Sequence, residues 1–311
     1  MQDVFLSIIP IFLLIVLGHG LRRGGIPSFE FWNMNDKLVY WVLMPALLFS
    51  KISTTHVESG LVGSFAVVIL GGFGVAVVFA LVSARALGMK GPVASSLLQG
   101  VTRHNTFIAL AVAESLFGPE GLALAAMGTA LLIPTTNVTV VALMVGLLRK
   151  RGQGGAVRAI LHDLARNPLL LAVGVGILAN LGGTGRIPVV HEIADLLGGA
   201  ALPIVLLCVG ANIRPRAMAA AMAPTVISML GKMVVFPAAI LLLALAMGLS
   251  PTETLVAVLF GAVPTAASGY TLARQMGGDA PLMAAMITLQ AVLALVTLPL
   301  TVVLVQGLLG P

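Results

Sequence analysis

The stretch Leu98-Gln99-Gly100-Val101-Thr102-Arg103-His104-Asn105-Thr106-Phe107 sets a polar cluster inside the otherwise apolar segment 92–117. The cluster lies roughly 11 to 13 residues from each end of that segment, close to the middle of a bilayer at about 1.5 Å per helical residue. A second apolar segment, 252–276, carries Pro264 at the matching depth. Unwound backbone at such a depth is tolerated only where it is buried in protein or lines a cavity. We therefore predict two broken helices that cross, with half-helix N-termini offering N–H groups to an anion.

The composition around these segments excludes a soluble domain. Of the 311 residues, 59% are hydrophobic and only 9% are charged, against roughly 45–50% and 25% in soluble proteins. The net charge of +6 comes from basic residues in loops without interleaved aromatic residues, which indicates membrane topology and no nucleic-acid partner. Cys208 is the one cysteine of the sequence, which excludes an intrachain disulfide and a multi-cysteine metal site.

Segments of about 20 apolar residues predict an all-α membrane protein with ten transmembrane helices. They lie near 4–21, 30–52, 60–84, 92–117, 120–148, 167–182, 189–212, 223–248, 252–276 and 281–308. Of the 17 Lys and Arg residues, twelve fall in one set of loops and two, Lys51 and Arg186, in the other. This positive-inside bias predicts two non-cytoplasmic termini, and we expect the protein in the bacterial inner (plasma) membrane.

The two halves of the chain show weak similarity at an offset of about 160 residues. Gly25-Ile26-Pro27 recurs as Arg186-Ile187-Pro188, and Gly91-Pro92 is matched by Ser250-Pro251. Because each half holds five spans, the second half enters the membrane from the opposite side. The prediction is an inverted repeat, with residues 1–150 as the first five-helix half, 151–166 as a cytoplasmic linker and 167–311 as the second half.

Polar residues near the two breaks are the candidates for substrate binding. Arg103 can bind a carboxylate bidentately, or it can form a structural pair with Glu114, Asp36 or a helix C-terminus. Asn105 can contact the substrate or cap a half-helix. The predicted substrate-binding residues are Asn105, Arg103, Thr106, Pro264, Thr265, Ser268, Tyr270 and Asn137.

Five further residues are candidates for coupling or charge pairing. His104 can relay protons, although a buried, hydrogen-bonded neutral histidine is the favoured interpretation. Glu114 is expected near the outer mouth, and Lys232 as a counter-ion for Asp36 or for the substrate. Gln290, like Asn137, places an amide in an apolar span, where hydrogen bonding between helices is the favoured role.

Several segments resemble a known family in their order and spacing. They are Leu38 to Phe49, Arg103-His104-Asn105-Thr106 with Phe117-Gly118, Pro134 with Asn137, Asn167-Pro168, Leu202-Pro203 with Gly210, Lys232 with Pro237, Pro264 to Ala273, Gly277-Gly278-Asp279 and Thr297-Leu298-Pro299. Over nearly its whole length the chain resembles the auxin efflux carrier family, the bacterial relatives of plant PIN transporters.

The resemblance implies that the first, second, sixth and seventh of the ten predicted helices (helices 1, 2, 6 and 7) form a scaffold and that the other six form a transport domain. It also implies carboxylate binding around Asn105 and Pro264. Ala109 and Ala111 depart from the family pattern, because Gly and Pro often occur at these positions. This departure predicts a less sharply broken first crossing helix.

The predicted function is a carrier for a small organic anion, a mono- or dicarboxylate, that works by elevator-like alternating access. Alternatives are a sodium-coupled symporter of the bile-acid type, and a channel or sensor without alternating access. An enzyme is not expected, because no His-Glu-x-x-His motif or paired carboxylates are found. We expect no cofactor and no metal site, leave H⁺ or Na⁺ open as a coupling ion, and leave open a homodimer through the scaffold helices.

Overall fold

The described part of the protein is mostly helical and contains no strand. The structure is a computed structural model that describes residues 2–54, 61–148, 165–183, 186–213 and 222–309. Five apolar helical segments within them are long enough to cross a membrane: Gly63–Ala86, Gly91–Leu147, Val190–Ala211, Met222–Met247 and Ala280–Leu309. Most of the predicted linker 151–166 lies outside the described residues. The described residues thus agree with an all-α membrane protein, and the ten spans in two inverted halves stay a prediction.

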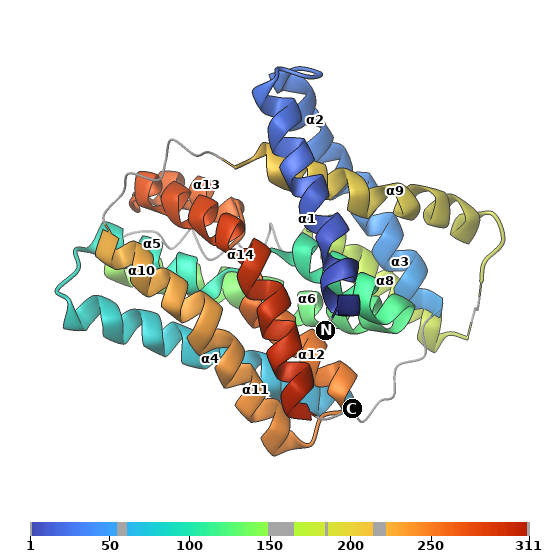
Figure 1. Cartoon of the computed structure of the whole chain (residues 1–311). Coiled ribbons are helices and arrows are strands. Elements are labelled where there is room, and N and C mark those ends of the chain that lie inside the picture. The colour runs from blue at the N-terminus through green and yellow to red at the C-terminus, as the bar shows by residue number, and fades with distance from the viewer. Residues whose placement is uncertain (1, 55–60, 149–164, 184–185, 214–221, 310–311) are drawn as a thin grey trace. The chain divides into compact units, whose positions relative to one another are not determined.

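The chain divides into two compact units, each built from separate stretches of sequence (Figure 1). Unit 1 comprises Met1–Leu61, Phe107–Ala130 and His162–Ile213, and unit 2 comprises Val62–Thr106, Leu131–Leu161 and Arg214–Pro311. Both units draw on both halves of the sequence, so long-range packing holds each of them together.

Unit 1 contains α1 (Gln2–Arg23), α2 (Phe29–Leu38), η1 (Val39–Leu43), α3 (Met44–Thr54), α8 (Pro168–Leu181), α9 (Val190–Ala211) and the first part of α6 (Thr106–Leu147). α9 packs against α1 and α3, and α3 also packs against α8. Glycine makes the approach of α1 to α9 close: a Cβ at Gly18 would lie 2.0 Å from the carbonyl oxygen of Leu207, and one at Gly210 would lie 1.8 Å from that of Ile15. Small residues of this kind let membrane helices pack backbone to backbone.

Unit 2 contains α4 (Leu61–Ala86), α5 (Gly91–Thr102), the last part of α6, α10 (Met222–Leu230), η3 (Gly231–Val235), α11 (Phe236–Met247), α12 (Pro251–Ala262), α13 (Ser268–Met276) and α14 (Ala280–Leu309). α12 packs against α11 and α14, and α10 packs against α5. A Cβ at Gly261 would lie 2.7 Å from the backbone of Pro237, so α12 ends directly against the start of α11.

Proline and glycine interrupt several of these helices at defined places. The five-residue π-helices η1 and η3 directly precede Met44-Pro45 and Phe236-Pro237. A wider turn of this kind fits in front of a proline, because proline has no N–H to donate to the preceding helical turn. In α6, Gly118 has φ 61° and ψ −147°, a conformation that only glycine adopts readily, and it kinks the helix near the predicted boundary between segments 92–117 and 120–148.

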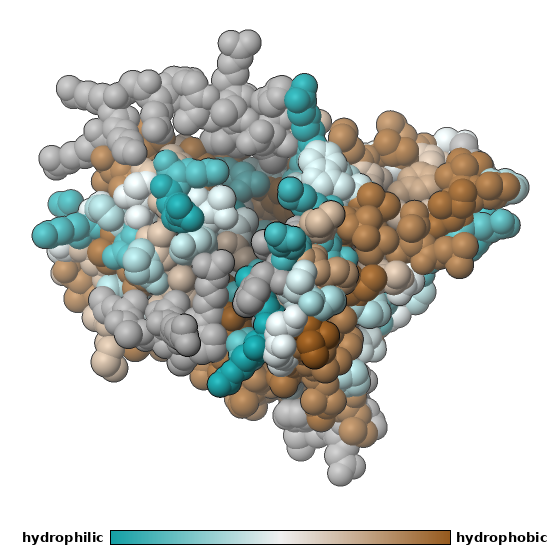
Figure 2. Space-filling model, turned by 90° about the horizontal axis from the view of Figure 1, so that it is seen from above, coloured by the Kyte–Doolittle hydropathy of each residue, from teal (hydrophilic) through white to brown (hydrophobic). Residues whose placement is uncertain are grey.

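Large apolar side chains cover much of the visible surface in Figure 2. Leu13 and Leu196 in unit 1 and Leu242 in unit 2 are 61%, 79% and 67% exposed. A soluble monomer rarely exposes such extensive apolar area. Lipid contact explains why these residues face outward.

Candidate functional site

Two helices of unit 2 are interrupted, and the interruptions lie against each other. α5 ends at Thr102 and α6 begins at Thr106, while α12 ends at Ala262 and α13 begins at Ser268. The residues that follow α5 and α12, Arg103 and Val263, are both extended, with ψ 148°. We call the segments 103–105 and 263–267 the crossover. The N–H of Asn105 donates to the carbonyl oxygen of Pro264 at 2.8 Å, and the Thr265 hydroxyl donates to that of Gln99 at 3.2 Å.

Gln290 in α14 joins both interruptions. Its Oε1 accepts from the N–H of Thr265 at 2.9 Å, and its Nε2 donates to the carbonyl oxygen of Gly100 and to Ser228 Oγ, both at 2.9 Å. One fully buried amide therefore satisfies backbone groups that the broken helices leave without helical partners. The hydrogen bonding between helices is present, and a role of Gln290 in coupling stays a prediction.

Arg103 is buried at the C-terminal end of α5, and its partners are neutral. Its Nε donates to Gln99 Oε1 at 3.2 Å, Nη1 to Ser268 Oγ at 3.4 Å and Nη2 to Asn137 Oδ1 at 3.1 Å. In the described part of the chain these are its side-chain hydrogen bonds, and none goes to a carboxylate. The negative C-terminal end of α5 favours a positive charge at this position. The described residues of the crossover supply no counter-ion to the guanidinium.

His104 is buried, but it is not hydrogen-bonded as the favoured interpretation expected. Neither Nδ1 nor Nε2 has a hydrogen-bond partner among the described residues. The ring instead meets the Phe260 ring edge to face, with centroids 5.5 Å apart. The described residues thus give the imidazole an aromatic contact and no hydrogen bond, and a role of His104 in coupling or charge pairing stays a prediction.

Lys232 and Asp36 have different partners. The ammonium of Lys232 donates to the carbonyl oxygen of Phe260 at 3.0 Å, and its side chain is 0% exposed. Asp36, in unit 1, accepts from Asn212 Nδ2 at 3.1 Å. Pairing of Lys232 with Asp36 or with a substrate stays a prediction, as do the roles of the half-buried Thr106 and of Tyr270, whose ring lies 6.0 Å from the Arg274 guanidinium.

Comparison with known proteins identifies the family. The model of a family described as "Membrane transport protein" matches residues 3–302. The chain belongs to this family, the auxin efflux carriers. The transporter is 24% identical over 299 residues to an "Uncharacterized transporter" of Methanothermobacter thermautotrophicus, covering 94% of this chain and 96% of that one. It is 27% identical over 292 residues to a "Putative malonate transporter" of Rhizobium meliloti, covering 89% and 88% of the two chains.

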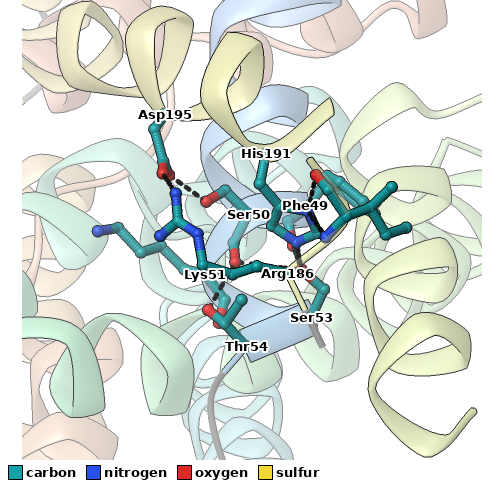
Figure 3. Close-up of polar contacts among 9 residues, drawn as sticks. Phe49, Ser50, Lys51, Ser53, Thr54, Arg186, His191 and Asp195 are labelled. Carbon is teal, nitrogen blue, oxygen red and sulfur yellow. Dashed lines mark hydrogen bonds and ion pairs between the residues drawn. The ribbon is translucent and has the colours of Figure 1, made fainter. Parts of the chain in front are cut away.

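Unit 1 of the transporter holds a separate cavity of about 470 Å³. Four charged residues line it, namely Lys51, Glu114, Arg186 and Asp195. Asp195 accepts from Ser50 Oγ and pairs with Arg186 Nη2 at 2.6 Å (Figure 3). Glu114 therefore belongs to the lining of this cavity, together with Ser115 and Ala111.

The sequence reasoning missed Asp195 and His191. Asp195 is a carboxylate inside a predicted span, a signal that marks a functional or paired residue. The N–H of Ile187 donates to His191 Nδ1 at 2.9 Å. His191 Nε2 and Ser53 Oγ are hydrogen-bonded at 2.8 Å (Figure 3). His191 therefore ties α9 to α3.

Proposed function

We propose that this transporter carries a small organic anion, a mono- or dicarboxylate such as malonate, and that the anion binds at the crossover. The mechanism we propose is alternating access by an elevator-like motion. The predicted spans 4–21, 30–52, 167–182 and 189–212, which contain α1, α2 to α3, α8 and α9, form the scaffold, and the other spans form the transport domain. The proposal includes ten spans in two inverted halves, with both termini outside the cytoplasm of a bacterial inner membrane.

The likeness of α5 and α12 supports the inverted repeat. Each helix is 12 residues long, carries proline in its first turn and ends at an extended residue with ψ 148°. In each, the N–H of that last residue still donates to a carbonyl four residues back, that of Gln99 or Leu259. Two interruptions built alike and joined to each other are typical of repeats that form a central site.

The observation that carries the proposed substrate class is a buried guanidinium with neutral partners. Arg103 has five N–H donors, and three of its described hydrogen bonds go to Gln99, Ser268 and Asn137. A buried charge without a counter-ion is costly, so a bound carboxylate would stabilise the site. The N-terminal ends of α6 and α13 would add positive dipole ends, and His104 would add a ring nitrogen donor.

The relative in Rhizobium meliloti, by its name, supports a dicarboxylate. The test is uptake of radiolabelled malonate, malate and acetate into proteoliposomes by purified wild type and by Arg103→Gln. We expect malonate uptake by the wild type and a loss of at least about 100-fold in the variant, because two charge-assisted hydrogen bonds contribute about 1.5–3 kcal/mol each.

Arg274→Gln is the matched control. Arg274 is an exposed arginine of α13 whose guanidinium lies beside Tyr270, and its loss should leave uptake close to that of the wild type. The decisive protein is Arg103→Gln that elutes as a single species in detergent. If it takes up malonate as fast as the wild type, the crossover has no part in the mechanism.

A further inference from the structure

Pro264 leaves a backbone carbonyl in the last turn of α12 without its helical partner. The carbonyl oxygen of Phe260 would accept from the N–H of residue 264, but proline has none. Lys232 Nζ donates to this oxygen instead, at 3.0 Å. The ammonium also lies 4.5 Å from the centroid of the Phe236 ring, and the whole side chain is buried. The amino group of Lys232 therefore occupies the C-terminal end of this half-helix.

The equivalent carbonyl of α5 is satisfied differently. Gly100 precedes the extended residue Arg103 by three positions, as Phe260 precedes Val263. The carbonyl oxygen of Gly100 accepts from the neutral amide of Gln290 at 2.9 Å. A neutral donor is thus sufficient to satisfy such a carbonyl, and satisfying Phe260 alone does not explain a buried lysine at the second break.

The place that Lys232 occupies is one that suits a coupling cation. Half-helix C-terminal ends and unwound carbonyls coordinate Na⁺ in transporters with inverted repeats, because the negative dipole end and the carbonyl oxygens attract a cation. The carboxylates of unit 2 lie elsewhere: Glu253 is in the first turn of α12, and Asp279 directly precedes α14. The crossover therefore lacks the carboxylate oxygens that a hard cation prefers.

We propose that Lys232 is a built-in cation that replaces a metal ion at the end of α12, and that transport does not depend on sodium. The statement about transport rests on the proposed function, whereas the statement about the ion site does not. Removal of the ammonium frees the Phe260 carbonyl and leaves space beside it. Lys232→Ala should therefore acquire a site that accepts a small cation.

The first experiment measures the midpoint of thermal unfolding of purified protein in sodium chloride and in choline chloride at equal ionic strength. The wild type should melt at the same temperature in both salts. Lys232→Ala should melt lower in choline and recover in sodium by about 5 °C, since a ligand that binds only the folded state raises the midpoint. A sodium-dependent midpoint in the wild type, or a variant as insensitive to sodium as the wild type, overturns the proposal.

Gln290→Ala is the matched control, because it removes the neutral donor from the equivalent carbonyl of Gly100. It should melt lower in both salts without a sodium response, and a sodium response equal to that of Lys232→Ala counts against a specific ion site. If Lys232→Ala does not fold, Lys232→Met fills the same space without the charge, and its lower midpoint together with a sodium-insensitive wild type supports the proposal.

The second experiment measures malonate uptake into proteoliposomes with and without an inward sodium gradient. Equal wild-type rates support the proposal, and a rate that requires sodium overturns it. If the wild type takes up no malonate, the proposed substrate fails, and the melting experiment still decides the ion site.

Discussion

The approach of α1 to α9 in unit 1 predicts a large effect of a single methyl group. In Gly210→Ala the new Cβ would lie 1.8 Å from the carbonyl oxygen of Ile15 and 2.6 Å from its carbonyl carbon. A C···O contact needs about 3.3 Å, so the helices must separate locally by about 1.5 Å. Because both atoms belong to the backbone, no side-chain rotation relieves the clash.

The cost follows from the same geometry. Overpacking costs about 1–3 kcal/mol, and separation of the helices also loosens the reciprocal approach of Gly18 to Leu207. A destabilisation of about 3 kcal/mol would lower the melting temperature by roughly 6–10 °C.

The assay uses the one cysteine of the sequence as a reporter. Cys208 lies two residues before Gly210, is 1% exposed and packs with Trp32 and Ala211. A thiol-reactive fluorophore therefore reacts as this interface opens, and light scattering during the same ramp follows aggregation independently.

The matched control is Gly199→Ala in the same helix. Its Cβ would meet nothing within 4 Å, and alanine is a better helix former than glycine by about 1 kcal/mol. Its melting temperature should equal or slightly exceed that of the wild type. If Gly210→Ala has the same melting temperature as Gly199→Ala, the close approach of the two backbones is refuted.

Two further predictions concern each unit in turn. His191→Phe keeps an aromatic ring beside Phe49 but removes the hydrogen bond to Ser53 Oγ and the acceptor of the Ile187 N–H. We expect a loss of about 1–3 kcal/mol in stability, read as a lower melting temperature, with malonate uptake retained. Lost uptake in folded protein would contradict a purely structural role. For unit 2, the rate of exchange of external for internal malonate in proteoliposomes should not change when a potassium diffusion potential is applied. The rate of net malonate uptake should change. If both rates respond to the potential, the charge balance given below is contradicted.

The sequence predicted the helices well and their partners poorly. Segments 92–117 and 252–276 were recognisable because polar residues or proline stand in the middle of apolar runs, and the structure breaks both helices there. Bounds of most apolar segments agree with the helices within a few residues, since hydrophobicity and proline act locally.

Partners depend on long-range packing, which no local pattern encodes. Asn137 accepts from Arg103 across 34 positions, and the Phe260 carbonyl accepts from Lys232 across 28 positions, so both contacts require separate helices to meet. Gln99, by contrast, lies four residues before Arg103 and is a local partner. The ring contact of His104 with Phe260 likewise joins residues far apart in the sequence. In unit 1, the pairing of Asp195 with Ser50 joins residues 145 positions apart.

If the substrate is an organic anion bound at the crossover, as proposed, the two buried basic residues of unit 2 predict a dicarboxylate rather than a monocarboxylate. Arg103 and Lys232 are both buried, and neither has a described carboxylate partner. With both charged, a malonate dianion brings the loaded crossover close to neutrality, whereas a monocarboxylate leaves one positive charge. Moving a charge through the membrane costs or gains about 2.3 kcal/mol per 100 mV, so the potential acts on the return of the empty, positively charged crossover. An inside-negative potential would then hold the empty site toward the cytoplasm, and net uptake of the dianion would slow as the potential rises while exchange continues unchanged.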